Sequence, residues 1–394
     1  MLERLTANRE NLVKSIPLVE LQAQRRRLGT RIDDAILRVC EHANFIMGDE
    51  VKAFERQLAE FCGARHALTC GNGTDALLLG LMAKRVGPGH AVFCPTFTFA
   101  ATAEVVALVH ATPVFVDVLN DTFNIDPDSL EAAIETARGA GLRPSGIISV
   151  DMFGQPADYG SLQDIAEQQG LWILADAAQS FGAQYRGRRV GHITELTATS
   201  FFPSKPLGCY GDGGAIFTDD DELAKCIDSL RIHGKGSDKY DNVRIGMNSR
   251  LDAIQAAILT EKLAIFPEEL AARQVIAQRY SDGLGDVVRT PRTSNEATSA
   301  WAAYTIVAEG CDRDKMAADL KAAGISTAIY YPMPLHRQTA YRNFPRASDN
   351  GLPQAERLAQ SVLSLPMHPY LDPATQDRVI STVRELAGSC TLGG

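Results

Sequence analysis

Residues 66–76 read His66-Ala67-Leu68-Thr69-Cys70-Gly71-Asn72-Gly73-Thr74-Asp75-Ala76, a β-prone run that passes through two glycines into a helical run. The same alternation continues to residue 175, with strands expected at 91–94, 113–118, 146–152 and 171–175 and helices at 76–85, 101–109, 129–137 and 162–169. It predicts βαβ units, and therefore an α/β domain whose doubly wound, mainly parallel sheet is covered by helices. Functional side chains should then follow the strands, at the carboxyl edge of the sheet.

The rest of the chain predicts a second, smaller domain. Upstream of the alternating region, Asp49 is placed to cap a helix over residues 50–62. Downstream, the pattern changes to helical runs at 251–266 and 268–284, a strand at 303–308, a helix at 313–323, a strand at 327–331 and a closing helix at 377–386. We therefore predict a large α/β domain over residues 1–250, linking helices over 251–285 and a C-terminal α+β domain over 286–394.

Composition and charge narrow the choice of partners. The 394 residues carry 39 Lys and Arg against 48 Asp and Glu, a net charge of −9, without a basic block that would hold a nucleic acid backbone. The first ten residues carry charges throughout, unlike a signal peptide, and no run reaches the about 18 apolar residues of a membrane span, so we expect a cytoplasmic protein. The eight cysteines show no metal-ligand spacing, and we expect thiols and no metal site.

The turn at residues 71–76 is the first candidate for ligand binding. It joins an expected strand to an expected helix, so the N–H groups of a helix N-terminus and the Thr74 hydroxyl are placed to hold a phosphate. The six residues also fit the dinucleotide pattern G-x-G-x-x-A, but the next strand ends in Pro95-Thr96, without the acidic residue that holds a ribose. A tight turn that needs glycine fits equally well, and the absence of Gly-Lys-Ser/Thr excludes a P-loop.

Two further stretches carry residues suited to catalysis. Residues 172–180 contain an apolar run that ends at Asp176, with Gln179 close behind. A buried carboxylate there needs a cationic or N–H partner, and a pyridinium nitrogen or a helix N-cap role would supply one. Residues 200–215 place Lys205 before a proline and four glycines, where the backbone can approach a bulky ligand. A desolvated lysine there has the lowered pKa that Schiff-base formation needs; a surface lysine in a flexible loop is the alternative.

Taken in order, these motifs resemble one family. The set is Gly73-Thr74-Asp75, Asp176-Ala177-Ala178-Gln179, Ser200-Phe201-Phe202-Pro203-Ser204-Lys205 and Asn248-Ser249-Arg250, with Tyr331-Pro332 and Ser364-Leu365-Pro366-Met367-His368-Pro369 in the second domain. It is similar, over nearly the whole chain, to the pyridoxal-phosphate-dependent nucleotide-sugar aminotransferases, which have the aspartate aminotransferase fold (type I). The run Pro206-Leu207-Gly208-Cys209-Tyr210-Gly211-Asp212 most resembles the subgroup that aminates UDP-2-acetamido-2-deoxy-3-oxo-D-glucuronate for the O-antigen sugars of bacterial lipopolysaccharide.

The resemblance implies a cofactor, pyridoxal 5'-phosphate, and a role for each matching residue. Lys205 would form the Schiff base and then shuttle the proton, acting as nucleophile and general base. Asp176 would keep the pyridine nitrogen protonated, Gln179 would contact the ring face or the 3-hydroxyl, and Phe99 would stack on the other face. The phosphate would be held by the turn Gly73-Thr74-Asp75, by Ser200 and, from a neighbouring subunit, by Asn248, so the protein would be a homodimer with shared sites.

The resemblance also implies a reaction in two halves. L-glutamate would leave its nitrogen as pyridoxamine 5'-phosphate, and that amine would pass to the ketone of the nucleotide sugar. A uronate substrate requires cations, of which Arg250 is the first candidate because a guanidinium can grip a carboxylate bidentately. His233 and His336 are further candidates, and Tyr331 joins them as a substrate contact.

Several alternatives are weighed against this prediction. One is the 3- or 4-amination of a neutral dTDP- or UDP-linked 6-deoxy keto sugar, and a more remote one is an NAD-dependent dehydrogenase. A dehydratase of the same family would carry histidine in place of Lys205. A non-catalytic member of the family would lack Lys205 or Asp176, and both are present.

Overall fold

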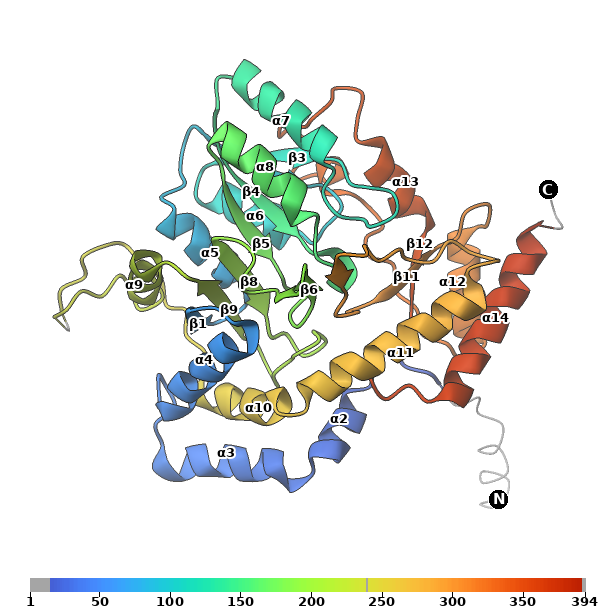
Figure 1. The fold of residues 1–394 in the computed structure, drawn as a ribbon, viewed down its shortest axis with the longest axis horizontal. Coiled ribbons are helices and arrows are strands. Elements are labelled where there is room, and N and C mark those ends of the chain that lie inside the picture. The colour runs from blue at the N-terminus through green and yellow to red at the C-terminus, as the bar shows by residue number, and fades with distance from the viewer. Residues whose placement is uncertain (1–14, 239, 392–394) are drawn as a thin grey trace, which may run out of the picture.

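The computed structural model describes residues 15–238 and 240–391 and is built around a seven-stranded sheet (Figure 1). The strands lie in the order β1-β9-β8-β5-β4-β2-β3. Their bounds are β1 His66–Cys70, β2 His90–Pro95, β3 Thr112–Val116, β4 Arg143–Val150, β5 Trp172–Asp176, β8 Leu196–Ser200 and β9 Gly214–Thr218. β9 is antiparallel to β1 and β8, and the remaining neighbours pair in parallel. The prediction of a mainly parallel α/β sheet is therefore confirmed.

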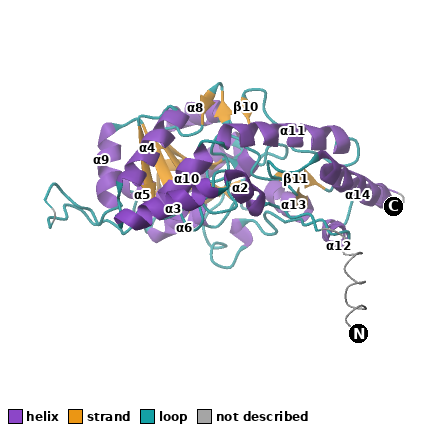
Figure 2. Ribbon diagram, turned by 90° about the horizontal axis from the view of Figure 1, so that it is seen from below, coloured by secondary structure: helices purple, strands orange, loops and turns teal. Residues whose placement is uncertain are grey.

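Helices cover both faces of this sheet, as a doubly wound fold requires (Figure 2). One face carries α5 Gly73–Ala83, α6 Ala101–Leu108 and α9 Asp221–Leu230, and the other carries α4 Asp49–Cys62, α7 Pro127–Gly139, α8 Tyr159–Gln169 and α10 Ala253–Leu263. Successive strand residues alternate between the faces: Phe93 belongs to the core under α7 and α8, whereas Val92 and Cys94 belong to the core under α5 and α6. Both faces of the parallel strands are thus buried, which explains their nearly continuous apolar sequence.

A smaller α+β unit follows in the sequence. Its elements are the antiparallel pair β11 Tyr304–Val307 and β12 Val362–Leu365, with α12 Arg313–Ala322, α13 Pro353–Ser361 and α14 Pro373–Thr391. The long helix α11, Phe266–Leu284, links the two units, because Phe266 packs in the core under α4 and α10 while Tyr280 and Leu284 pack with β11 and α14. The smaller C-terminal α+β domain is confirmed, and the residue boundaries 1–250, 251–285 and 286–394 stay a prediction.

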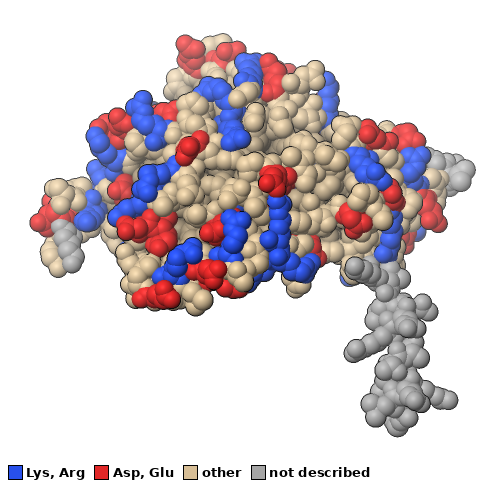
Figure 3. Space-filling view, turned by 60° about the horizontal axis from the view of Figure 1, so that its bottom comes forward, with Lys and Arg blue, Asp and Glu red and all other residues tan. Residues whose placement is uncertain are grey.

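Short elements complete the described chain. The helices α2 Leu21–Leu28 and α3 Thr30–His42 lie at its start, a small sheet is formed by β6 Gln184–Tyr185, β7 Arg188–Arg189 and β10 Ala297–Thr298, and single 3-10 turns occur at Met152–Gly154 and Leu335–Arg337. Arg31 of α3 forms a salt bridge with Glu261 of α10 at 2.7 Å. On the face drawn in Figure 3, Lys and Arg side chains are interspersed with Asp and Glu side chains.

Residues 327–331, which were expected to form a strand, do not form one. Only Ala328 meets β12, through an isolated bridge to Ser364, and the chain then leaves the sheet so that Tyr330 and Tyr331 line the cavity described below. Thr, Ile and Tyr are common in strands and also in packed loops, so composition alone could not separate the two cases.

Two local expectations were also wrong. Asp49 is the first residue of α4 and not its N-cap, a position held by Gly48; the Asp49 carboxylate pairs instead with Lys52 at 3.3 Å. Cys311 and Cys390 form a disulfide across 79 residues, because the start of α12 and the end of α14 lie side by side, while the other described cysteines are free.

The start of the described chain runs along the small domain. Ile16 N donates to Gly324 O at 2.8 Å, and Met367 N donates to Leu18 O at 3.1 Å.

The charged first ten residues, which argued against a signal peptide, lie outside the described residues. Within residues 15–238 and 240–391, no helix is both long and apolar enough to span a membrane.

Candidate active site

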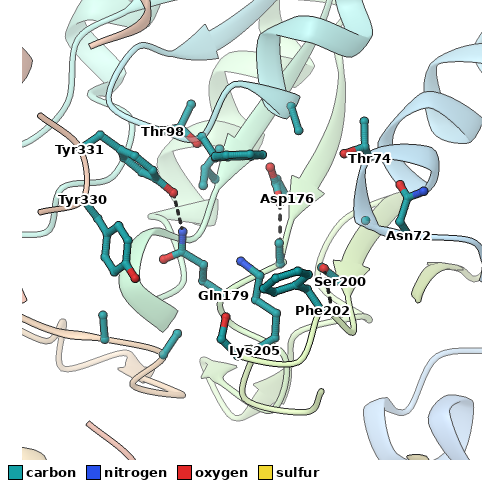
Figure 4. Close-up of a pocket in the computed structure, with 18 of the residues that line it drawn as sticks. Asn72, Thr74, Thr98, Asp176, Gln179, Ser200, Phe202, Lys205, Tyr330 and Tyr331 are labelled. Carbon is teal, nitrogen blue, oxygen red and sulfur yellow. Dashed lines mark hydrogen bonds between the residues drawn. The ribbon is translucent and has the colours of Figure 1, made fainter. Parts of the chain in front are cut away.

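A cavity of about 700 Å³ opens at the carboxyl edge of the parallel strands, between the large and the small domain. It brings together nine of the residues predicted from the sequence, namely Gly73, Thr74, Asp75, Phe99, Asp176, Gln179, Ser200, Lys205 and Tyr331. They come from four separate strand ends and, in the case of Tyr331, from the segment between α12 and α13. In Figure 4 the amine of Lys205, the carboxylate of Asp176 and the amide of Gln179 converge on the same space.

The turn after β1 gives the cavity the N-terminus of α5. Asn72 is the N-cap, and its Oδ1 accepts a hydrogen bond from Asp75 N at 2.8 Å. A Cβ at Gly73 would lie 2.7 Å from Cβ of Ser200, so only glycine lets the helix start lie against the end of β8. The free N–H groups and dipole of this helix start, next to the hydroxyls of Thr74 and Ser200, form a site suited to a phosphate.

Asp75 has a second partner behind the turn. Its Oδ2 accepts a hydrogen bond from Ser249 Oγ at 2.7 Å, and Ser249 Oγ accepts one from Gly71 N at 2.9 Å. The carboxylate therefore links the turn to the segment that carries Asn248 and Arg250. This link joins residues 174 positions apart and left no sign in the local sequence pattern.

Asp176, at the end of β5, is 7% exposed. Thr102 Oγ1 donates to its Oδ2 at 2.9 Å, and Ala178 N donates to its Oδ1 at 3.2 Å. Burial raises the pKa of Asp176, and the hydrogen bonds and the charge of Lys205 oppose that rise. A cation placed against this carboxylate would be strongly stabilised. Thr102 was not predicted, because a threonine inside a helical run gives no functional signal.

Lys205 lies in the loop after β8 and faces the same space. Burial of the ammonium group lowers the pKa of Lys205, and the charge of Asp176 opposes the shift. A lowered pKa increases the fraction of the neutral amine, which is the form that attacks a carbonyl carbon. The loop is thus able to supply both a nucleophile and a proton acceptor.

Aromatic side chains and Gln179 complete the walls. Gln179 Oε1 accepts from Phe153 N at 2.8 Å, and its Nε2 donates to Tyr331 Oη at 3.4 Å. The Phe99 ring is 61% exposed and lies 6.4 Å from the ring of Tyr331. An exposed phenyl ring in a concave wall is a surface on which a flat heterocycle can stack. Thr98, Phe202 and Tyr330 also line the cavity and were not predicted, although each is within three residues of a predicted one.

His336, a predicted substrate contact, does not reach the cavity. It is 2% exposed, and its ring nitrogens are both engaged, Nδ1 with Thr96 Oγ1 at 2.8 Å and Nε2 with Glu356 Oε1 at 2.9 Å. Burial lowers the pKa of His336, and the Glu356 carboxylate opposes this shift. The side chain joins the end of β2 to α13, which is a positioning arrangement.

His233, Asn248 and Arg250 lie outside the cavity of their own chain. His233 and Asn248 belong to a segment after α9, residues 232–238 and 240–248, which we call the arm; it projects from the body in Figure 1. A bridge between Ile232 and Asn248 closes its base. Val243 and Ile245 of the arm are open to solvent, with Ile245 89% exposed.

The described lining of the cavity carries more negatively than positively charged side chains. Among the described residues that line it, Lys205 is the one cationic side chain, beside three aspartates at positions 75, 176 and 212. One chain therefore offers an anionic ligand a helix N-terminus and a single amine.

The cavity fits pyridoxal phosphate on three observations. The helix start at Gly73 suits its phosphate, the buried Asp176 suits a protonated pyridine nitrogen, and the open face of Phe99 suits its ring. A sheet of this topology with a lysine and an aspartate at its carboxyl edge is typical of pyridoxal-phosphate-dependent aminotransferases of fold type I, and this chain is one of them. The model of the DegT/DnrJ/EryC1/StrS aminotransferase family matches residues 26–384, and the chain belongs to that family.

Individual relatives agree with this assignment. The chain is 47% identical over 361 residues to the UDP-2-acetamido-2-deoxy-3-oxo-D-glucuronate aminotransferase of Pseudomonas aeruginosa, covering 91% of this chain and 97% of the relative. A DegT DnrJ EryC1 StrS aminotransferase from Brucella abortus has a similar crystal structure, with a TM-score of 0.92, 51% identity, and coverage of 95% of this chain and 100% of the other. The putative sugar aminotransferase Spr1654 from Streptococcus pneumoniae, solved in its PLP form, has a TM-score of 0.85, 27% identity, and coverage of 92% and 97%.

Proposed function

We propose that this aminotransferase moves the amino group of L-glutamate to C3 of UDP-2-acetamido-2-deoxy-3-oxo-D-glucuronate, for the O-antigen sugars of lipopolysaccharide. The observation that carries the proposal is the 47% identity, over nearly the full length of both chains, to the P. aeruginosa enzyme of that name. The single cavity that holds a lysine, a buried aspartate and a helix N-terminus supports the same chemistry. We also propose a cytoplasmic location.

Each residue of the cavity then has a role. When bound, pyridoxal phosphate supplies a protonated ring that withdraws electrons from the substrate carbon. Lys205 holds it covalently and moves the proton at that carbon, while Asp176, held by Thr102, keeps the pyridine nitrogen protonated. Phe99 and Gln179 contact the ring.

In this proposal the start of α5 would hold the phosphate of the cofactor. Gly73, Thr74 and Ser200 hold it there, with Asp75 bracing the turn through Ser249. Asn248 of a second copy completes this site.

The charges in the cavity support a homodimer with shared sites, which is part of this proposal. Glutamate and a nucleotide-linked uronate bring several negative charges, whereas Lys205 is the one cation among the described lining residues. The missing cations have to come from another surface, and the arm of a second copy carries His233 with Arg250 at its base. Arg250 is the residue that we propose for the sugar carboxylate, with Tyr331 lining the sugar side of the cavity.

The test of this substrate is a competition between two ketones. Glutamate is supplied with either UDP-2-acetamido-2-deoxy-3-oxo-D-glucuronate or a neutral UDP-linked 6-deoxy keto sugar, and amino-sugar product is measured by mass. We expect kcat/KM for the uronate to exceed that for the neutral sugar by about a hundredfold, because a charged contact is lost with the neutral sugar. Arg250→Ala should remove most of this preference. Equal or faster turnover of the neutral sugar would overturn the proposed substrate.

A further inference from the structure

The loop that presents Lys205 is closed tightly against itself. Lys205 N donates to Phe202 O at 2.9 Å. Three residues further on, a Cβ at Gly208 would lie 2.5 Å from Pro203 O and 2.7 Å from Phe202 O, so no other residue fits there without moving the backbone. Gly208 therefore packs directly on the peptide groups that precede Lys205, and a shift of Gly208 moves the base of the Lys205 side chain.

A second buried lysine forms a hydrogen bond with the backbone of Gly208. Lys262 of α10 is 1% exposed, and its Nζ donates a hydrogen bond to Gly208 O at 2.6 Å. The ammonium group also lies 4.1 Å from the centre of the Tyr210 ring, a cation–π contact. Burial lowers the pKa of Lys262 to about 8, while the charges of Cys209 and Glu269 act in the opposite direction.

The same face of α10 makes one more polar contact with the loop. Gln255 precedes Lys262 by seven residues, two helical turns, and its Oε1 accepts from Tyr210 N at 2.9 Å. Two side chains of α10 therefore form hydrogen bonds with the loop backbone, one at Gly208 and one at Tyr210. Within residues 15–238 and 240–391, Lys262 forms no salt bridge, and a lysine buried without a directly paired carboxylate destabilises a fold.

We propose that Lys262 is a positioning residue for Lys205: by fixing Gly208 O it holds the loop so that the Lys205 amine reaches the carbonyl carbon of the cofactor. The proposal rests on the proposed role of Lys205. Formation of a covalent bond depends steeply on placement, whereas binding through phosphate and ring contacts does not use the amine. Lys262 should therefore affect covalent attachment much more than non-covalent binding.

The test compares two forms of the cofactor on one variant. In Lys262→Met, a side chain of similar length without charge or donor, we expect the affinity for pyridoxal phosphate and the borohydride-trapped fraction to fall about tenfold, while the affinity for pyridoxamine phosphate changes by less than about threefold. Visible absorbance, protein fluorescence and intact mass measure these three quantities. Equal weakening of both forms would mean that Lys262 only supports the fold, and no change in either would mean that it has no role; both overturn the proposal.

Three further variants make the result decisive. Lys225→Met, at an exposed lysine of α9 paired with Glu222, is the matched control and should behave as wild type. Tyr210→Leu, at a half-exposed position over the ammonium, should lower trapping in the same direction as Lys262→Met. If Lys262→Met does not fold, unchanged trapping in Tyr210→Leu counts against the proposal. Lys205→Ala distinguishes the two proposals. If it still traps cofactor like wild type, the proposed role of Lys205 is wrong and the proposal for Lys262 falls with it. If it loses trapping while Lys262→Met keeps trapping, only the proposal for Lys262 is overturned.

Discussion

At the scale of single residues, burial moves two pKa values in opposite directions within one cavity. It raises the pKa of Asp176, against the hydrogen bonds from Thr102 and Ala178, and it lowers the pKa of Lys205, against the charge of Asp176. Both shifts favour the neutral forms. A ligand that brings a cation to the carboxylate and a carbonyl carbon to the amine relieves both groups at once, which is what pyridoxal phosphate offers.

The variant Lys205→Ala tests the role of the lysine amine. We expect loss of the visible absorbance of bound cofactor and of the mass added by borohydride reduction, with kcat reduced by at least about a thousandfold, because both the nucleophile and the proton carrier are removed. Absorbance, intact mass and steady-state kinetics check this expectation. Lys84→Ala, at a surface lysine paired with Glu195, serves as the control. A borohydride-stable cofactor adduct on Lys205→Ala would show that another residue carries it.

At the scale of elements, the site depends on how strand ends meet helix starts. The end of β8 and the start of α5 touch at Ser200 and Gly73, where a Cβ on the glycine would overlap the serine. The end of β4 is tied to the turn after β5 by Asp151, whose carboxylate accepts hydrogen bonds from Ser180 Oγ at 2.6 Å and from Tyr159 Oη at 2.7 Å. These contacts set the spacing between the phosphate end and the ring end of the cavity.

Gly73→Ala should separate β8 from α5. The added methyl would lie 2.7 Å from the Ser200 Cβ, so the turn has to shift, and overpacking of this kind costs about 1–3 kcal/mol of the free energy of unfolding. We also expect the affinity for pyridoxal phosphate to fall about tenfold, since the helix start moves away from the phosphate. Fluorescence titration and urea unfolding measure the two effects. Gly87→Ala, where the nearest atom to the added methyl is 4.0 Å away, should change neither, and similar losses in both variants would refute the steric explanation.

We expect the stability of the fold to depend on pH through the buried carboxyl group of Asp151. Burial raises its pKa from 3.8 to about 7, despite the hydrogen bonds from Ser180 and Tyr159. The folded chain therefore keeps a proton that the unfolded chain releases, and the contribution of this group to stability falls as the pH rises from about 4 to about 7. Asp151→Asn removes the titration, so its melting temperature without cofactor should vary less over that range. Asp164→Asn, at an exposed position of α8, should keep the wild-type slope; an equally steep slope in Asp151→Asn would contradict the assignment.

At the scale of the whole molecule, the cavity and its expected cations lie on different surfaces. The wall contributed by one chain, as far as it is described, carries Lys205 as its cation, while the arm extends from the body with Val243 and Ile245 exposed. Exposed apolar side chains on a projecting segment are typical of a surface that another chain covers. This arrangement favours a dimer in which each arm completes the site of its neighbour.

Mixed dimers test the shared site. Lys205→Ala and Asn248→Ala chains, each inactive in its own homodimer, are unfolded together, refolded and assayed. Random pairing puts one intact site in half of the dimers, so about one quarter of wild-type activity should return in a two-fold symmetric dimer. The two variants mixed without unfolding supply the baseline. If refolding restores no activity above that baseline, Asn248 does not act across the interface.

The sequence by itself determined the fold class and nine of the residues that line the cavity. The βαβ alternation placed Gly73 and Asp176 after expected strands, and parallel strands bring such positions to one edge regardless of the details of packing. Lys205 was predicted from its glycine-rich surroundings and from the family resemblance, because no strand was expected before it. Phe99 follows an expected strand in the same way, whereas the role of Ser200 came from the family resemblance. The residues that follow strands were predictable because their positions depend on the strand that precedes them in the sequence.

Only the tertiary structure decided which groups hold the residues proposed for catalysis, and which distant segments are joined. Thr102 lies 74 residues from the Asp176 that it holds, Lys262 lies 54 residues from Gly208, and Cys311 lies 79 residues from Cys390. His336 matched the expected side-chain chemistry, yet packing buried it between Thr96 and Glu356. Strand and helix periods specify which side of an element a residue occupies, but a hydrogen bond between distant elements depends on the packing of the whole core, which no local pattern records.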